Sequence, residues 1–503
     1  MQKGGENMFS FNLQKSVRKL SNLVKIGGSV TDEDFIVNEI KRFKYSIRRK
    51  NMVDGENYYN GKHDILKSKR TAIGENGDLI ELDNLPNNQA VDNQYKKMVD
   101  QKNNYLLGQP ITIQGDNELY CKLLKKVFNK KFHRLLKNVG EDCLNEGIAW
   151  LYPYYDEKGN FTFKRFKAYE IIPGWKDAEH TILDYIIRIY EVIKVEKTQE
   201  KIIEKVEVYD EKGVYYFTLD GERLIPDEIP FQNHFTMIDN DGMEYGYNWT
   251  KIPLIPFKYN SKEIPLIKMV KSLQDGINRI LSNFENNMEE DARNTIMILV
   301  NYDGENLGTF RKNLAQYGAV KVKTVDGAAG DLRTLQVEVN AENYKAILEI
   351  FKKAIIENAM GYDAKDDRMS GNPNQMNIAS MYSDIDLDAN GMETEFQASF
   401  EELLWFINCH FYNYGLGDFE NEEIEIIFNR DMLMNETEII TNCNNSTGVL
   451  SEETIIANHP WVDDPQKELE RKEEEKQKNI EQYGNAFNPQ PNNDPEGDDL
   501  DEE

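Results

Sequence analysis

Two long amphipathic patterns on either side of a short β-rich segment constrain the fold of this 503-residue chain most strongly. From Ile264 onwards, apolar residues recur at three- and four-residue steps, which predicts a helix of about 28 residues, or roughly 42 Å. A second such pattern runs from Ala341 to Met360. Together they predict an antiparallel helical stalk with a small β-rich module at its tip. The positions expected to pack within the stalk are Val270, Leu273, Ile277, Ile280 and Phe284 on the first helix, and Tyr344, Ile347, Phe351 and Ile355 on the second.

Both helices carry further apolar positions, among them Leu281, Leu348 and Ile356, that a two-helix stalk leaves uncovered. Self-association in a ring would bury them. An ordinary helical hairpin folded against the rest of the chain would also bury them, so the residues alone leave both alternatives open.

Ahead of the stalk, the chain reads as one α+β domain. Helices are expected from Thr31 to about Lys50, from about Asn93 to Gly108, and from about Lys131 to Gly147. Residues 148–260 contain strand-like runs separated by turn residues, which predicts antiparallel hairpins.

Beyond the stalk, residues 361–375 have no apolar period and predict a polar loop. A long helix is then expected from Met376 to about Asn413, interrupted by a kink at Asn390-Gly391. A strand over residues 423–430 and a helical C-terminal piece complete the expected order.

The charge excludes a generally basic nucleic-acid coat. The chain has 60 Lys and Arg against 88 Asp and Glu, a formal net charge of -28. Residues 481–503 hold eight carboxylates and no Lys or Arg, whereas residues 1–50 hold eleven Lys and Arg against five acids. The four cysteines are far apart and predict buried thiols of a reducing compartment. With no signal-peptide pattern and no apolar run of 18 residues, we expect a soluble intracellular product.

No motif for nucleotide or catalytic chemistry is present. The sequence lacks GxxxxGK[ST], GxGxxG, HExxH and GxSxG, and its six histidines are scattered. A two-metal nuclease would need converging carboxylates, but acid clusters arise by chance in a chain with 88 acids. The clusters are Asp363/Asp366/Asp367, Asp384/Asp386/Asp388 and Glu289/Glu290/Asp291.

Five runs, taken in the order of these elements, carry a resemblance to a known family. They are VDQKNNYLLGQPITI (99–113), IPLIPFKYN (252–260), NYDGEN (301–306), SGNPNQMNIASMYSDIDLDANGME (370–393) and NHPWVDDPQKELERKEEE (458–475). They resemble the portal proteins of tailed bacteriophages, and most closely the SPP1-type portal. The resemblance covers nearly the whole chain from about residue 30.

The resemblance implies a ring-forming structural protein with no catalytic residues, no cofactor and no metal. Such proteins form dodecameric rings at one capsid vertex, through which double-stranded DNA is packaged and later ejected. The implied partners are other copies of the chain, the terminase large subunit, a head-tail adaptor, and the major capsid and scaffolding proteins, with no membrane. The implied location is the virion, and the host cytoplasm during assembly. The alternatives are another head-tail connector component, or a metal-dependent nuclease or phosphoryl-transfer subunit.

Carried over segment by segment, the resemblance implies a portal fold with named parts. They are a flexible N-terminal arm (1–30), an α/β wing (31–262), a helical stem (263–294 and 340–360), a β-rich clip (295–339), a tunnel loop (361–375), a kinked tunnel helix with the second part of the wing (376–434), a helical crown (435–480) and a disordered acidic tail (481–503).

Two sets of site residues follow from this assignment. In the tunnel loop, cations beside acids would contact passing DNA weakly and without base readout. This loop is amide-rich where related proteins are often more apolar. The expected DNA-channel residues are Lys365, Asp366, Arg368, Ser370, Asn372, Asn374 and Gln375. The residues expected to dock terminase and adaptor on clip strand edges are Tyr302, Asp303, Glu305, Lys321 and Lys323.

Overall fold

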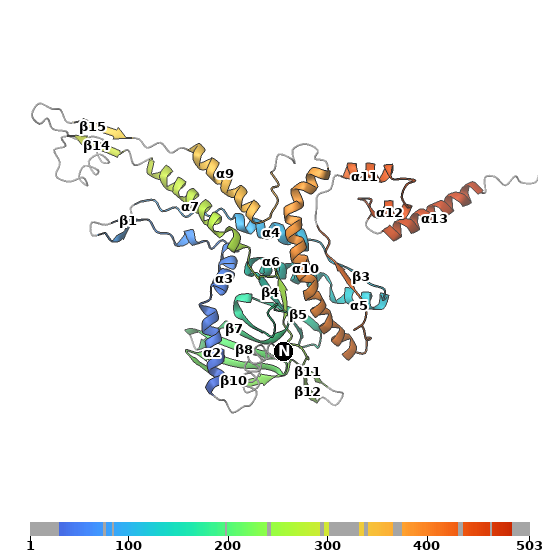
Figure 1. Ribbon diagram of the computed structural model, residues 1–503. Helices are drawn as coiled ribbons and strands as arrows, with labels where there is room; N and C mark the ends of the chain where they lie inside the picture. The colour runs from blue at the N-terminus through green and yellow to red at the C-terminus, as the bar shows by residue number, and fades with distance from the viewer. Residues whose placement is uncertain are drawn as a thin grey trace, which may run out of the picture. The chain divides into compact units, whose positions relative to one another are not determined.

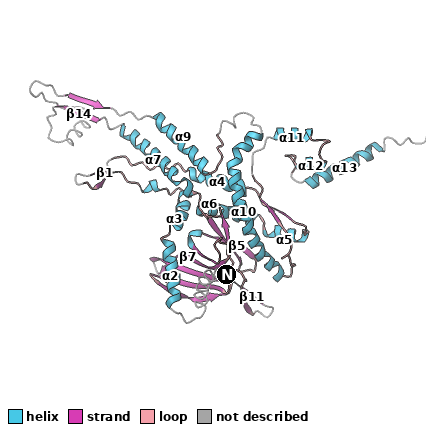
Figure 2. Cartoon of the chain, viewed as in Figure 1, coloured by secondary structure: helices cyan, strands magenta, loops and turns pink. Residues whose placement is uncertain are grey.

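The computed structural model of the protein (Figure 1) is described over residues 30–73, 77–82, 85–196, 199–238, 243–291, 296–300, 331–335, 341–365, 375–430, 436–462 and 465–484. Within these ranges helices and strands are both abundant (Figure 2), which confirms the α+β class. The chain divides into two compact units, Met1–Asp363 with Ser383–Asp431 and Ala364–Tyr382 with Met432–Glu503. A search of the described helices for one both long and apolar enough to cross a membrane finds none.

The first helical region is two helices, so the single helix expected from Thr31 to Lys50 is wrong. Helix α2 spans Val30–Lys44 and α3 spans Ile47–Tyr59. The break has a local cause, because the Ser46 hydroxyl accepts a hydrogen bond from the Arg49 backbone N–H at 3.1 Å and caps α3. The Asp54-Gly55 dipeptide is typical of turns, yet Gly55 lies buried inside α3. A Cβ there would lie 1.9 Å from the Asn145 carbonyl oxygen, so only glycine allows this close approach.

The next helices begin and end close to where their capping residues predict. Helix α4 spans Gln94–Leu107, and its N-cap Asn93 accepts a hydrogen bond from the Lys96 N–H at 2.9 Å. Helix α6 spans Lys130–Glu146 and ends at Gly147, whose φ of 84° is the left-handed conformation that favours glycine. Between them lie β3 (Thr112–Gln114) and α5 (Glu118–Val127).

The hairpins expected over residues 148–260 are confirmed, since the named strands there pair antiparallel. A five-stranded sheet has the order β10-β9-β8-β7-β6, and a three-stranded sheet has the order β13-β4-β5. Apolar residues of α2, including Ile36 and Ile40, are buried in one core with Ile187 and Val206 of the larger sheet. The strands are β4 (Ile148–Tyr155), β5 (Phe161–Phe166), β6 (Ile171–Trp175), β7 (Leu183–Glu196), β8 (Gln199–Asp210), β9 (Gly213–Asp220), β10 (Arg223–Gln232) and β13 (Ile255–Lys258).

Three smaller antiparallel pairs complete the first unit outside the stem. Strand β3 pairs with β16 (Glu425–Ile427), a shorter strand than the expected run of 423–430. The others are β1 (Thr71–Ile73) with β2 (Leu79–Glu81), and β11 (Phe235–Ile238) with β12 (Glu244–Tyr247).

The helical stalk is present as an antiparallel pair that leads to a strand pair (Figure 1). Helix α7 spans Ile267–Asp291 and α9 spans Ala341–Asn358. Strands β14 (Ile296–Val300) and β15 (Asp331–Leu335) lie between them in sequence and pair antiparallel.

Helix α10 spans Gln375–Asn413 as one continuous helix, so the interruption expected at Asn390-Gly391 is wrong, while a bend of the helix at this position stays a prediction. The flanking Ala389 and Met392 are both buried, and this tertiary packing outweighs the cost of about 1 kcal/mol of one glycine in a helix. In the second unit the expected C-terminal helices are α11 (Glu436–Asn445), α12 (Glu452–Ala457) and α13 (Pro465–Gly484).

The expectation of buried thiols holds for Cys143 and Cys443 only. Cys121 and Cys409 are half-buried, so the expectation is wrong for these two. All four cysteines are free.

Candidate functional site

The two stem helices pack through a short apolar seam. Of the residues predicted to form it, Val270, Ile277 and Ile355 are fully buried. The Phe284 and Tyr344 rings lie 5.0 Å apart, and the Asn287 amide donates to the Tyr344 hydroxyl at 3.0 Å. The seam is incomplete as a core, since Leu273, Ile280 and Phe351 are half-buried and Ile347 is 43 % exposed.

A second face of α7 is lined by buried uncharged polar side chains at every fourth position. Gln274, Asn278, Ser282 and Asn286 are between 0 and 6 % exposed. Residues four apart share one face of a helix, so these four make a continuous stripe, which we call the polar ladder.

The polar ladder binds an extended segment, residues 88–95, through its backbone. The Tyr95 N–H donates to Gln274 at 2.9 Å and the Asp92 N–H donates to Asn278 at 3.1 Å. Farther along, the Ala90 N–H donates to Ser282 at 3.0 Å and the Asn88 N–H donates to Asn286 at 2.7 Å. Four helical residues rise about 6 Å and two extended residues about 6.6 Å, so the repeats match over residues 88–92, and the last step, from Asp92 to Tyr95, spans three residues because α4 begins at Gln94. The segment therefore runs along α7 and satisfies its own backbone there.

The residues that follow the C-terminal end of α9 are fixed by contacts with α4. The buried ammonium of Lys102 donates to the Met360 carbonyl at 3.2 Å and pairs with Asp388 of α10 at 2.6 Å. Burial lowers the pKa of Lys102, and Asp388 opposes that shift. The Gln101 side chain makes two hydrogen bonds with the Tyr362 backbone, at 2.9 and 3.1 Å. The chain is therefore fixed as far as Tyr362, just before the predicted tunnel-loop cations.

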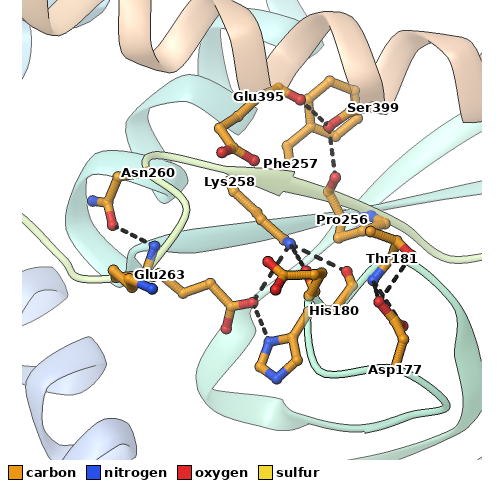
Figure 3. A network of polar contacts seen from close by, with 12 residues as sticks. Asp177, His180, Thr181, Pro256, Phe257, Lys258, Asn260, Glu263, Glu395 and Ser399 are labelled. Atoms are coloured by element: carbon orange, nitrogen blue, oxygen red, sulfur yellow. Dashed lines mark hydrogen bonds and ion pairs between the residues drawn. The ribbon is translucent and has the colours of Figure 1, made fainter.

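The root of α7 is fixed by a buried ionic network, shown in Figure 3. Glu263 lies in the loop between β13 and α7 with a φ of 54° and a side chain only 4 % exposed. It contacts His180 at 2.8 Å and Lys258 at 3.9 Å, and it pairs with Arg48. The Lys258 ammonium also donates to the His180 carbonyl at 3.1 Å. The loop that starts the stem is thus tied to β13 and to α3.

The same region is also joined to α10 through a serine hydroxyl. The Ser399 side chain donates to the Pro256 carbonyl of β13 at 2.7 Å (Figure 3). It also contacts the Glu395 carbonyl one turn earlier at 2.9 Å. The one hydroxyl hydrogen of this buried serine is thus shared between two carbonyl acceptors.

Two of the nine acids in the three clusters, Asp386 and Asp388, are engaged by protein donors. Asp388 contacts Lys102 and accepts from Tyr259 at 2.8 Å, while Asp386 accepts from Tyr105 at 3.0 Å and pairs with Arg430. These carboxylates already have the cationic partners that a metal ion would otherwise supply.

One group of acids in the described ranges lies close enough together to hold a metal ion: Glu56, Asp142 and Glu146. The Lys167 ammonium lies 3.0, 2.7 and 3.6 Å from them in that order. Burial raises the pKa of Glu146 well above its ordinary value, and the charge of Asp142 adds to this shift. Burial works against the charged form of Lys167, but Asp142 and Glu146 outweigh it and raise its pKa. Lys167 and Arg165, whose guanidinium lies 2.6 Å from Asp142, therefore supply positive charge at this cluster.

Most of the predicted channel and docking residues fall outside the described ranges. In the tunnel loop, Lys365 is exposed, and the Gln375 N–H donates to Glu438 of α11 at 2.8 Å. The residues outside the described ranges are Asp366, Arg368, Ser370, Asn372 and Asn374 of the tunnel loop, and Tyr302, Asp303, Glu305, Lys321 and Lys323 of the clip.

Sequence reasoning missed the polar ladder and the Lys102–Asp388 pair. The ladder had a readable signal, because amide and hydroxyl residues recur every four positions on α7, opposite its apolar stripe. The ion pair had none, since 286 positions separate residues that only the tertiary fold brings together.

Comparison with known proteins gives the family. The family model for the phage portal protein, SPP1 Gp6-like, matches residues 41–482. A portal protein of Bacillus phage SPP1 is 30 % identical over 460 residues, covering 90 % of this chain and 88 % of the relative. A portal protein of Clostridium phage phiCD119 is 30 % identical over 457 residues, covering 87 % of this chain and 96 % of the relative.

One solved structure is described as "Neck of native GTA particle computed with C12 symmetry". It is similar over 72 % of this chain and 88 % of its own, with 11 % identity and a TM-score of 0.38, values too low to bear on function. The family model and both phage relatives cover most of the described fold, including the stem and its supports. The chain belongs to the SPP1 Gp6-like family of phage portal proteins.

Proposed function

We propose that the chain assembles as a dodecameric ring at one capsid vertex and that double-stranded DNA passes through the channel of this ring during packaging and ejection. The ring is part of the virion, and it forms in the host cytoplasm during assembly. Its partners are the major capsid and scaffolding proteins, the terminase large subunit and a head-tail adaptor. The role is structural, with no catalytic step and no cofactor.

The observation that carries the proposal is the unequal coverage of the two stem helices. Helix α7 is covered on one face by α9 and on another by residues 88–95. Helix α9 leaves Ile347 43 % exposed and Ile350 66 % exposed, three residues apart on one face. In a ring, one surface of each copy packs against a different surface of the neighbouring copy. The exposed face of α9 can therefore be buried in every copy.

The tunnel loop, residues 361–375, contacts passing DNA weakly in this proposal. Ring symmetry repeats Lys365 and Arg368 as circles of positive charge, and the neighbouring acids Asp363, Asp366 and Asp367 reduce the attraction. Contacts to phosphates alone carry no sequence information, so DNA can slide.

The clip, residues 295–339, docks terminase and adaptor through its strands, of which β14 and β15 are described. A two-stranded sheet has free edges that can accept a strand from a partner. Deletion of residues 303–331 should leave rings that form but do not bind these partners, and undiminished binding would refute the docking assignment.

Negative-stain microscopy of the purified protein tests the central proposal. Annular particles with a central hole are expected. Compact monomers that cleave DNA only when Mg²⁺ is present would overturn it in favour of a nuclease or phosphoryl-transfer subunit.

A further inference from the structure

Helices α5 and α6 carry a concentration of positive charge that the stem and the tunnel loop do not explain. Residues 119–140 contain seven Lys and Arg and no Asp or Glu, in a chain whose net charge is -28. Six of the seven side chains are exposed and Lys137 is half-buried. None of the seven makes an ion pair within 4.0 Å with any residue that the structure describes. They are Lys122, Lys125, Lys126, Lys130, Lys131, Arg134 and Lys137.

Four of these cations line one groove. A cavity of about 890 Å³ lies between α5, α6, the start of β5 and the C-terminal end of α10, and we call it the basic groove. Its lining includes Lys126, Lys130, Lys131 and Arg134, and no carboxylate lines it among the described residues. A second cavity, of about 770 Å³, is lined by Asp116, Glu401, Glu423 and Glu425 with no cation among the described residues. The two cavities therefore carry opposite charge.

The neutral polar groups of the basic groove also suit an anion with many oxygen atoms. Asn129, Asn138, Asn160 and Thr162 line it, and amide and hydroxyl groups are common phosphate partners in protein–DNA contacts. His410 also lines it, but burial lowers the pKa of His410, so the ring adds no charge at neutral pH.

We propose that the basic groove and the exposed cations beside it bind the phosphate backbone of double-stranded DNA outside the channel, without reading sequence. The proposal rests on the proposed function, which brings the ring and DNA together. A duplex presents one charge per about 1.7 Å of its axis, and a row of unpaired cations along two consecutive helices matches such an evenly charged ligand.

The net charge of the chain does not oppose this binding. At physiological ionic strength exposed charges are screened beyond about 8 Å, so a phosphate in the groove interacts mainly with the cations that line it. An acidic protein segment is the competing ligand, because the groove also has apolar lining residues such as Phe161 and Phe163. The three cations outside the lining, Lys122, Lys125 and Lys137, favour the more extended polyanion.

The test uses covalently closed circular DNA, which has no end and cannot thread a closed ring. Purified full-length rings are mixed with the circle, and filter retention is measured from 50 to 200 mM salt. Each phosphate contact releases about 0.9 ions. If all four groove cations contact phosphates, the affinity of wild-type rings for DNA should therefore fall about 100-fold between 50 and 200 mM salt. Reversal of the four groove cations to Glu (K126E, K130E, K131E and R134E) should abolish retention, and the matching Gln variant should flatten the salt dependence.

The control variant reverses four exposed cations elsewhere on the same unit, so that the change in net charge is identical. It carries K62E, K201E, K212E and K262E, all at exposed positions. Microscopy checks that each variant still forms rings. Retention by the control and loss by the groove variant support the proposal.

Three results would overturn the proposal. The first is that wild-type rings retain no circular DNA, and the second is that the charge-matched control loses as much DNA retention as the groove variant. The third is that a peptide with residues 485–503 binds through the same four cations and DNA does not. That peptide carries seven carboxylates and no Lys or Arg. In each case rings that form and package linear DNA leave the proposed function intact.

Discussion

The ammonium of Lys102 on α4 lies 2.6 Å from the carboxylate of Asp388 on α10, and Lys102 is only 3 % exposed. The same ammonium donates to the Met360 carbonyl where α9 ends. One buried cation therefore joins three helices at the point where the stem gives way to the tunnel-loop segment.

Removing this cation should destabilise the first unit. Lys102→Ala leaves Asp388 partly buried with Tyr259 as its remaining donor, and breaking a buried pair costs about 3–5 kcal/mol. The measurement is the urea midpoint followed by tryptophan fluorescence. Lys97→Ala, an exposed lysine of the same helix, should shift the midpoint little. The double variant Lys102→Met with Asp388→Leu should recover most of the loss, and an unchanged midpoint in Lys102→Ala would contradict the structural role.

The polar ladder should be sensitive at its centre. Asn278→Leu removes the acceptor of the Asp92 N–H and the partner of His63 Nδ1, which lies 2.7 Å away. Each buried group left unsatisfied costs about 1–3 kcal/mol. Hydrogen exchange at residues 88–95 should accelerate before global unfolding. Asn283→Leu, at an exposed position of the same helix, is the control, and equal exchange in the two variants would show that the ladder does not hold the segment.

Acid should destabilise the protein through His234. Burial lowers the pKa of His234 to about 4, and its Nδ1 accepts a hydrogen bond from the Trp249 N–H at 3.1 Å. The unfolded chain takes up this proton near pH 6.5 and the native chain does not, so stability falls as pH drops from 6.5 to 4. The loss from this residue is about 3 kcal/mol at the lower end.

His234→Gln removes this titration. The free energy of unfolding of this variant should therefore change less between pH 6.5 and pH 4 than that of the wild type. The comparison holds even when the two proteins differ in stability at pH 7.5. Two parallel curves would exclude His234 as the source.

The exposed face of α9 should matter for ring assembly but not for folding. Ile347→Glu with Ile350→Glu places two charges where neighbouring copies are proposed to pack. Losing the burial of even one such side chain should lower the association constant at least about tenfold. Mass photometry should show fewer rings, with unchanged circular dichroism. Lys353→Glu changes the net charge equally without removing an apolar group, and it should assemble normally. Rings at wild-type yield in the double variant would exclude this face as an interface.

The tunnel-loop assignment is tested in packaging. Lys365→Ala with Arg368→Ala removes both circles of positive charge, so packaged DNA length, packaging rate or ejection should change. Wild-type values for all three would show that these residues do not contact DNA during passage.

The sequence predicted best where a local signal determines the structure. Asn93 and Gly147 limit α4 and α6 through capping and a positive φ, and the stem helices follow their own apolar period. Residues whose role depends on distant partners were predicted wrongly or missed. Gly55 reads as a turn residue, yet contact with Asn145 makes it part of a packed helix. The polar face of α7 was given no partner from the sequence, yet residues 88–95 cover it.

The matched repeats of α7 and residues 88–95 have a mechanical consequence. The twelve helical steps from Gln274 to Asn286 span about 18 Å, and any bend or unwinding in that stretch would break several hydrogen bonds at once. Helix α7 therefore resists bending along the stretch to which residues 88–95 are hydrogen-bonded. A bend of α7 consequently has to lie outside this stretch, toward the Glu263 loop at one end of the helix or toward Asp291 at the other.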